Sequence, residues 1–247
     1  MSFGVTVLGF SGMFATAQRA ASGYLLDLRG RKVWLDAGAG TWQQLLRHAD
    51  YRELDGVIVT HRHPDHTTDL LQCFHARHYG APEPMDPLPV WTTQETIDRL
   101  TEFSKESSEA FDFRPVAGGD EVEIAGAEVT FHAMAHPPET VGVRIDLGGA
   151  VLAYSSDTGP EMDFTALAAD ADVFICEATF QGNDSWEGHL SAADAGRIAR
   201  EQRCRRLVLT HLPAGRDLER SLAEARSEAG DVEVLLAQQG LRLEVGS

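Results

Sequence analysis

Short apolar runs separated by polar turns fill the first third of the chain and predict β-strands. They are GVTVLG, SGYLLDL, KVWLDAG and DGVIVT, at residues 4–9, 22–28, 32–38 and 55–60. These runs are rich in branched apolar and aromatic side chains and are bounded by glycine or polar residues, which is typical of strands.

Helical and strand patterns alternate through the rest of the chain. The apolar spacing predicts helices at 41–49, 67–79, 94–110, 161–169, 191–203 and 217–228. It predicts strands in a hairpin within 121–134 and at 141–147, 150–156, 172–178, 206–211 and 232–237. The proline-rich stretch 81–89 is expected to be a loop. An antiparallel-rich start followed by β/α alternation fits two sheets between helices, an α/β (α+β) fold with residues 1–247 as one domain.

Composition narrows the choice of partner. The 247 residues include 21 Lys and Arg against 38 Asp and Glu, a formal net charge of −17. Nucleic-acid-binding proteins usually carry a basic stripe, so this charge counts against a large RNA or DNA partner. The alternative is that the acidic residues serve only solubility.

The N-terminal segment and the cysteines bear on location. MSFGVTVLGF lacks the basic region of a signal peptide, and no apolar run approaches the roughly 20 residues of a membrane span. Cys73, Cys176 and Cys204 form an odd, widely spaced set, which is typical of reduced and buried thiols. We therefore expect a cytoplasmic protein that does not bind membranes.

The stretch THRHPDH, residues 60–66, gathers three histidines and an aspartate directly after an apolar run. His61 and His63 are two apart at the end of a predicted strand, so their side chains should leave one face. Pro64 then turns the chain, and Asp65 and His66 should open the helix predicted from residue 67. A metal site needs three or more converging donors with a position open for water.

Further donors follow other predicted strands. His136 precedes Pro137 and Pro138, Asp157 precedes Thr-Gly-Pro, and His211 ends the run RLVLT. Each alone has a plainer explanation, as a surface or core histidine or a turn aspartate. Together with residues 61–66 they predict a metal site. Imidazoles and carboxylates suit Zn²⁺ first, with Mn²⁺ or Fe as alternatives.

The pattern His61-x-His63-x-Asp65-His66 resembles the signature of the metallo-β-lactamase superfamily, whose fold is a four-layer αββα sandwich. The similarity extends over essentially the whole chain and implies two divalent metal ions. One would be held by His61, His63 and His136, the other by Asp65, His66 and His211, and Asp157 would bridge them. The implied enzyme is a hydrolase that uses a metal-bridging hydroxide, with Asp65 orienting that water or taking its proton.

Two later segments extend the candidate site. Ser191 and Asp194 form a predicted capping box, so His189 should stand directly before a helix N-terminus. A histidine oriented there by Glu177 would be a good proton donor to a departing oxygen. The plainer alternative makes Glu177 a surface charge and His189 a loop residue.

These segments, CEATF and GHLSAADAGRIA, are similar to those of ribonuclease Z and its phosphodiesterase relatives, as are YSSDTGP and AHPPETVGVRI. The chain departs from that pattern at Ser156 in place of glycine, at Cys176 in place of histidine, and in the leucine after His189. None of these departures removes a candidate metal ligand.

Members that process tRNA commonly carry a long basic arm between the third histidine and the bridging aspartate. Here residues 137–156 are all needed for two strands and the Gly148-Gly149 turn. The pattern most resembles bacterial cyclic-nucleotide phosphodiesterases, so we expect a small phosphodiester substrate such as a cyclic 3′,5′-nucleotide. The alternatives are a tRNA 3′-end endonuclease, a carboxylic ester or lactone hydrolase, and a binding module without activity. The sequence leaves open the roles of Arg144, His75 and His78, and it is compatible with a homodimer.

Overall fold

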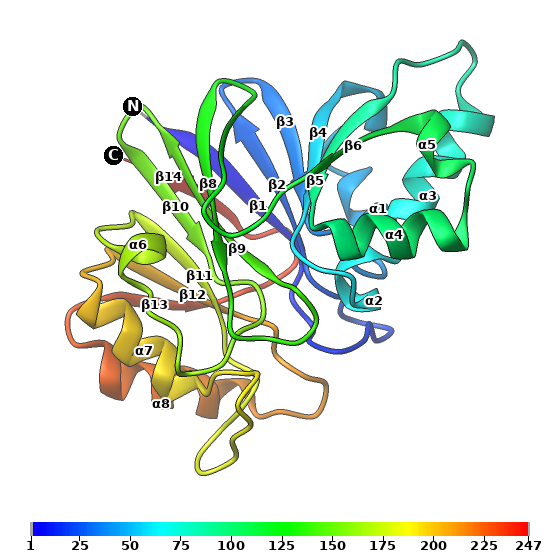
Figure 1. Ribbon diagram of the computed structural model, residues 1–247. Helices are drawn as coiled ribbons and strands as arrows, with labels where there is room; N and C mark the ends of the chain where they lie inside the picture. Colours follow the sequence, from blue (N-terminus) through cyan, green and yellow to red (C-terminus); the bar gives the residue numbers. More distant parts are fainter. Residues whose placement is uncertain (1, 247) are drawn as a thin grey trace.

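The computed structural model describes residues 2–246 as two seven-stranded mixed sheets packed face to face between helices (Figure 1). The first sheet has, in spatial order, β14 (Arg242–Val245), β1 (Phe3–Gly9), β2 (Gly23–Leu28), β3 (Arg31–Leu35), β4 (Leu54–Val59), β5 (Leu88–Thr92) and β6 (Phe111–Pro115). The second has β13 (Glu233–Leu236), β12 (Arg206–Thr210), β11 (Val173–Glu177), β10 (Ala150–Tyr154), β9 (Val141–Leu147), β8 (Ala127–Ala133) and β7 (Glu121–Ile124).

Helices cover the outer face of each sheet. On the first sheet lie α1 (Thr41–Leu45), α2 (Pro64–Thr67), α3 (Leu70–His75), α4 (Gln94–Phe103) and α5 (Ser107–Ala110), with a 3-10 turn at Tyr51–Glu53 and a π-helical turn at Ala76–Gly80. On the second lie α6 (Thr165–Ala168), α7 (Ala192–Glu201) and α8 (Leu218–Ala229). This is the four-layer αββα sandwich expected from the sequence, and the predicted fold class is confirmed.

Side-chain alternation along the strands separates two hydrophobic cores. In β4, Ile58 faces the large core between the sheets, whereas Val57 and Val59 join a smaller core beneath the outer helices. Leu70 and Phe74 of α3 close that smaller core. Successive side chains of a strand point to opposite faces, so a central strand of a sandwich must be apolar on both.

The strand directions bring the carboxyl ends of several strands to the same end of the sandwich. Strands β10 to β13 run parallel, and β8 runs in the same direction because β8–β9 and β9–β10 are both antiparallel. The ends of β8, β10 and β12 therefore lie at the same end of the second sheet. The end of β4 in the first sheet meets them, since the Val141 N–H donates to the Thr60 carbonyl at 3.1 Å.

Several predicted elements differ from those observed. The helix expected at 67–79 starts earlier, at Pro64, and is divided into α2, α3 and the π-helical turn. The helix expected at 94–110 is interrupted because Ser104 has an extended conformation, with φ −141°. The helices expected at 41–49 and 161–169 are reduced to the single turns α1 and α6.

Three strands were not predicted, namely β5, β6 and β14. Strand β5 begins at Leu88, inside the stretch expected to be a loop, and contains Pro89. Strands β6 and β14 lie at the two edges of the first sheet, where exposed positions weaken the apolar pattern. None of the helices between residues 2 and 246 has the length and apolar character that a membrane span requires.

Candidate metal centre

The structure brings together all seven candidate metal ligands. They come from the segments that follow β4, β8, β10 and β12 and are His61, His63, Asp65, His66, His136, Asp157 and His211. Donor atoms of His61, His63, His136 and Asp157 lie within 4.8 Å of one another, and so do those of Asp65, His66 and His211. The same two groups were expected from the sequence.

Asp157 lies between the two groups. Its Oδ2 atom is 3.6 Å from Nε2 of His61 and 3.4 Å from Nε2 of His211, and its Oδ1 atom is 3.3 Å from Nε2 of His66. One carboxylate thus reaches histidines of both groups, as a bridging ligand must.

The local structure around residues 61–66 corrects two predictions. Strand β4 ends at Val59, so His61 and His63 lie in the loop beyond it rather than on a strand face. His63 occupies the N-cap position of α2 without a side-chain capping hydrogen bond, while Asp65 and His66 lie inside that helix instead of preceding it. Pro64 is the first residue of α2, a position that suits proline because no backbone N–H is needed there.

Each of four imidazoles has an oxygen partner on its Nδ1 side. Nδ1 of His66 lies 2.7 Å from Oδ2 of Asp36, and Nδ1 of His136 lies 2.8 Å from the Gly188 carbonyl oxygen. The partners of His211 and His61 are the Thr179 hydroxyl, at 2.8 Å, and the Thr60 hydroxyl, at 3.2 Å. Such contacts fix the ring orientation and leave Nε2 for a metal ion.

Asp36 is a site residue that the sequence reasoning missed. It is fully buried and also accepts hydrogen bonds from the Tyr154 hydroxyl at 2.9 Å and the Thr60 N–H at 2.8 Å. The signal was an aspartate at the end of the run KVWL, directly before Ala-Gly-Ala-Gly. The apolar pattern places Asp36 inside a predicted strand. No other candidate ligand stands near it in the sequence, so nothing there marks it as a site residue.

Ser156, which departs from the glycine of the pattern that the sequence resembles, extends this network. Its φ of 52° lies in the left-handed region that glycine adopts most easily. Its hydroxyl donates to the Thr60 hydroxyl at 2.7 Å, and the Thr60 hydroxyl donates in turn to Asp36. The serine therefore links the end of β10 to the groups that orient His66.

Burial and charge separate the histidines into two kinds. Burial lowers the pKa of His61, His63 and His136 below the usual value, which favours the neutral imidazole that a metal binds. Burial alone would lower the pKa of His66 and His211 too. The surrounding carboxylates, Asp157 first among them, outweigh it, raising the pKa of His66 well above normal and that of His211 to about 9.

The pKa values of the two carboxylates, Asp157 and Asp65, are lowered although both groups are buried. Burial alone would raise the pKa of Asp157 and Asp65, but the facing histidines hold both values below the usual range. His211 acts most strongly on Asp157, and His66 on Asp65. Both carboxylates are therefore ionised at neutral pH.

Two buried atoms at the centre fit a cation. Within the described chain, Nε2 of His66 and Oδ1 of Asp157 form no hydrogen bond, although they are only 3.3 Å apart. Buried polar atoms are rarely left without a partner. Imidazole nitrogens and carboxylate oxygens converging on one point suit divalent metals such as Zn²⁺.

His189 and Glu177 adjoin this cluster. Nδ1 of His189 lies 2.9 Å from Oε1 of Glu177, which also accepts the Thr158 N–H at 2.6 Å. Glu177 is fully buried at the end of β11, so its alternative interpretation as a surface charge is wrong. The predicted capping box of Ser191 and Asp194 is confirmed at the start of α7.

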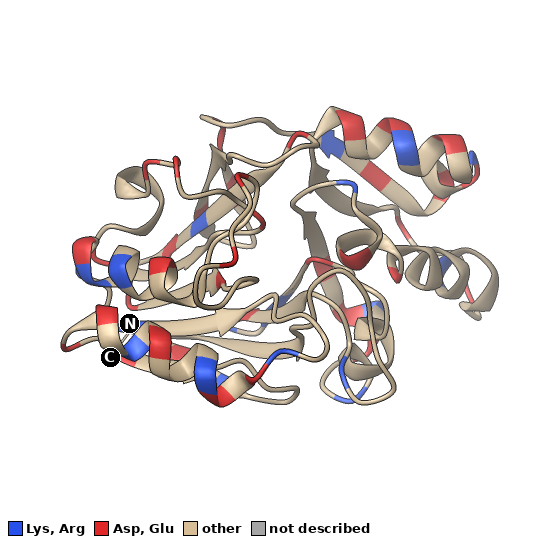
Figure 2. Ribbon diagram, turned by 90° about the horizontal axis from the view of Figure 1, so that it is seen from below, with Lys and Arg blue, Asp and Glu red and all other residues tan. Residues whose placement is uncertain are grey.

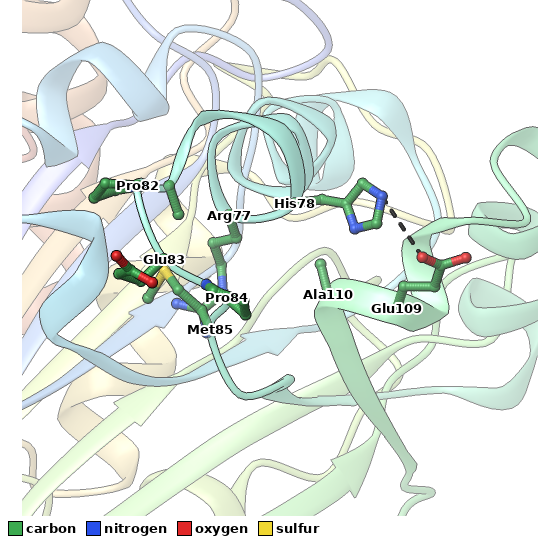
Figure 3. Close-up of a pocket in the computed structure, with 9 residues that line it drawn as sticks. Arg77, His78, Pro82, Glu83, Pro84, Met85, Glu109 and Ala110 are labelled. Carbon is green, nitrogen blue, oxygen red and sulfur yellow. Dashed lines mark ion pairs between the residues drawn. The ribbon is translucent and has the colours of Figure 1, made fainter.

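Other residues considered in the sequence lie elsewhere. His78 lines a cavity of about 390 Å³ together with Arg77, Glu83 and Glu109 (Figure 3). Its Nε2 atom is 3.6 Å from Oε2 of Glu109. None of the candidate metal ligands lines this cavity. Arg144 donates to the carbonyl oxygens of Leu167 and Ala169 and so has a structural role. The three cysteines are buried free thiols, as expected.

Comparison with known proteins agrees with this geometry. Residues 31–212 match the family model described as "Beta-lactamase superfamily domain". An uncharacterized protein of Mycobacterium leprae is 35% identical, over 91% of this chain and 82% of that protein. The ribonuclease Z of Haloferax volcanii is 26% identical, over 99% of this chain and 96% of that protein.

A third relative is known in sequence and in structure. The probable metallo-hydrolase YhfI of Bacillus subtilis is 29% identical, over 85% of this chain and 86% of that protein. Its crystal structure, titled as a metallo-beta-lactamase fold protein, aligns with a TM-score of 0.90 and 26% identity, over 98% of this chain and 99% of YhfI.

Proposed function

This chain belongs to the β-lactamase superfamily and is a metal-dependent hydrolase of that family, and we propose that it is a phosphodiesterase acting on a small phosphodiester. A cyclic 3′,5′-nucleotide is the first candidate substrate. The observation that carries the proposal is the His189–Glu177 pair beside a cluster of seven candidate metal ligands. The three buried thiols fit the reducing cytoplasm, which is the proposed location.

We propose that the cluster holds two divalent cations, Zn²⁺ first and Mn²⁺ or Fe as alternatives. The first site would use His61, His63 and His136, the second Asp65, His66 and His211, with Asp157 shared. Bound there, the ions would supply Lewis acidity to the phosphoryl group and a water of lowered pKa.

Asp65 is the proposed orienting group for the attacking water. Its Oδ2 atom accepts the Met13 N–H at 2.7 Å and lies 3.2 Å from Nε2 of His211. The contacts to Met13 and to His211 together fix the orientation of the Asp65 carboxylate. An ionised and fixed carboxylate at this position can hold the water and accept its proton.

His189 is the proposed acid on the leaving side. Its Nδ1–H donates to Oε1 of Glu177, while Oε2 of Glu177 accepts the Thr179 hydroxyl at 2.7 Å. The buried carboxylate therefore fixes the orientation of the His189 ring and leaves its Nε2 side free for the substrate. As the proposed acid, His189 carries a proton on each ring nitrogen, and the proton passed to the departing oxygen is the one on Nε2. One ring nitrogen of His189 lies in a group with donor atoms of Asp157 and His211, all within 4.8 Å of one another.

Three features favour a small substrate over tRNA. Strands β9 and β10 and their turn occupy most of the interval between His136 and Asp157, as expected, so this interval has no extended arm. Lys and Arg are outnumbered by Asp and Glu, 21 against 38, and the blue segments of the ribbon in Figure 2 are interspersed with red ones. The alignment with the H. volcanii ribonuclease Z spans 311 residues, so that protein has segments for which this chain has no counterpart.

A substrate panel tests the proposal. Metal-loaded protein is offered cyclic nucleotides, a precursor tRNA, and acyl esters and lactones under one set of conditions. The proposal expects the highest kcat/KM on cyclic nucleotides. A higher kcat/KM on the tRNA would establish the endonuclease alternative, and ester or lactone hydrolysis without phosphodiester hydrolysis would establish the acyl hydrolase alternative.

A further inference from the structure

Exposed apolar side chains border the metal cluster on two loops. Trp186 is 43% exposed, Met13 62% and Phe14 54%. Trp186 lies on the loop after β11 (yellow), which projects at the bottom of Figure 1, and Met13 and Phe14 lie on the loop after β1 (blue). Large apolar groups exposed to solvent beside a polar site are typical of a surface that contacts a ligand.

Trp186 is close to the proposed chemistry. The centre of its ring is 5.2 Å from that of His189 and 5.9 Å from that of His136. His189 is the proposed acid, and His136 is a proposed metal ligand. A substrate whose phosphoryl group is held between these histidines and Asp157 has its next chemical group within reach of the indole.

The position of the indole ring is fixed by the local backbone. The His189 N–H donates to the Trp186 carbonyl oxygen at 3.1 Å, which closes a tight turn. A β-carbon on Gly188 would lie 2.3 Å from the Trp186 ring, so the ring packs directly on the Gly188 backbone. The carbonyl of the same Gly188 binds His136, and one short turn therefore sets the distance between the ring and the metal cluster.

The space beside the ring is large enough for a flat ligand. A cavity of about 390 Å³ is lined by Trp186, His189, Pro160 and the loop 182–185, together with Ser191 and Asp194. Pockets of this size bind small organic ligands. An aromatic ring with one fixed and one exposed face is the usual platform on which a nucleobase stacks.

We propose that Trp186 stacks on the nucleobase of the substrate, so that the phosphodiesters bound best are nucleotides rather than base-free phosphate esters. The inference rests on the proposed function, because the phosphoryl group must lie on the metal cluster for the base to reach the indole. Stacking does not read base edges. Purine and pyrimidine nucleotides are therefore both bound, the larger ring systems more tightly.

Binding to metal-loaded protein tests this independently of turnover. The probes are adenosine 5′-monophosphate and ribose 5-phosphate, which differ in the presence of the base. Calorimetry measures the affinity of each probe for wild type, W186A, W186F and F103A. Phe103 is the matched control, since it is an aromatic residue 77% exposed at the end of α4. We expect W186A to weaken the nucleotide about 5- to 100-fold, the range of base stacking on an aromatic side chain.

The other measurements separate stacking from structural support. Ribose 5-phosphate should bind equally well to wild type and W186A, W186F should recover most of the nucleotide affinity, and F103A should match wild type. The nucleotide should also quench tryptophan emission in wild type but not in W186A, because Trp34 and Trp91 are buried and Trp42 packs against the smaller core beneath the outer helices. Unchanged nucleotide affinity in W186A, or equal weakening of both probes, would overturn the inference.

Hydrolysis assays keep this test distinct from that of the proposed function. Cyclic-nucleotide hydrolysis by wild type, with W186A unchanged in KM and nucleotide affinity, overturns the stacking role and leaves the phosphodiesterase proposal standing. Base-dependent binding that W186A abolishes, without hydrolysis of any phosphodiester, supports the stacking role and contradicts the phosphodiesterase.

Discussion

Nδ1 of His189 and Oε1 of Glu177 are 2.9 Å apart, and this carboxylate is shielded from water while the imidazole faces the metal cluster. The same carboxylate also accepts hydrogen bonds from the Thr158 N–H and from the hydroxyl of Thr179, two residues away. Its position is therefore fixed by two other segments of the chain and by its own loop. The arrangement predicts that His189 delivers a proton and that Glu177 only orients it.

The first prediction concerns H189A. Loss of a positioned acid should lower kcat on a cyclic nucleotide, whose leaving group is a poor alkoxide, by about 10²- to 10⁴-fold. The loss should be much smaller on bis(p-nitrophenyl) phosphate, because p-nitrophenolate leaves without a proton. Elemental analysis should find the wild-type metal content in H189A. Equal losses on both substrates, or lost metal, would contradict a proton-donating role.

The second prediction concerns Asp36. Replacing it with alanine removes the partner of His66 Nδ1, and loss of such an orienting carboxylate costs about 10- to 100-fold in metal affinity. The control is Y154F, which removes one hydrogen bond to Asp36, worth about 1 kcal/mol of stability, but keeps the carboxylate. Competition with a fluorescent zinc chelator measures both affinities. Wild-type metal affinity in D36A would show that His66 needs no such partner.

The third prediction concerns protons released by metal. Without metal, the raised pKa of about 9 keeps His211 protonated at pH 7, and His66 is protonated for the same reason. A metal ion must displace these protons, so zinc binding should acidify a weakly buffered solution and should tighten as pH rises from 7 towards 9. Calorimetry in buffers of different ionisation enthalpy counts the protons. Zinc uptake without proton release would contradict the proposed ligands His66 and His211.

The fourth prediction concerns Gly12, which packs against His211. A β-carbon at this position would lie 2.8 Å from the His211 carbonyl oxygen and 2.9 Å from its Nδ1 atom. G12A should therefore displace His211 and weaken the metal group that contains it. G4A is the matched control, because a β-carbon on Gly4 meets only Asp27 at an ordinary 3.6 Å. Equal metal content and activity in the two variants would show that this contact is unimportant.

Much of the site could be predicted because its residues follow strands. His136, Asp157 and His211 are far apart in the sequence, but the carboxyl ends of β8, β10 and β12 lie at the same end of the second sheet. Apolar runs reveal the strands, and the residue after each run is then a candidate for this edge. The three histidines and one aspartate of residues 60–66 indicate a metal site that needs further ligands from such positions.

The rest could not be predicted, for identifiable reasons. Asp36 acts through contacts to Thr60 and Tyr154, which are distant in sequence and have no shared pattern. Trp186 lies on an irregular loop, where neither strand nor helix periodicity places a side chain. The first turn of α2 was missed because four polar or proline residues give no apolar spacing.

The measurement that tests the central claim most directly is the metal content of wild type and D157A. Each protein is loaded with Zn²⁺, freed of excess ion and analysed for metal and protein together, with circular dichroism to confirm the fold. The account predicts two ions per wild-type chain and fewer than two in D157A, since Asp157 reaches both groups of histidines. A folded wild type that holds no zinc, or a D157A variant that holds two ions as tightly as wild type, would contradict it.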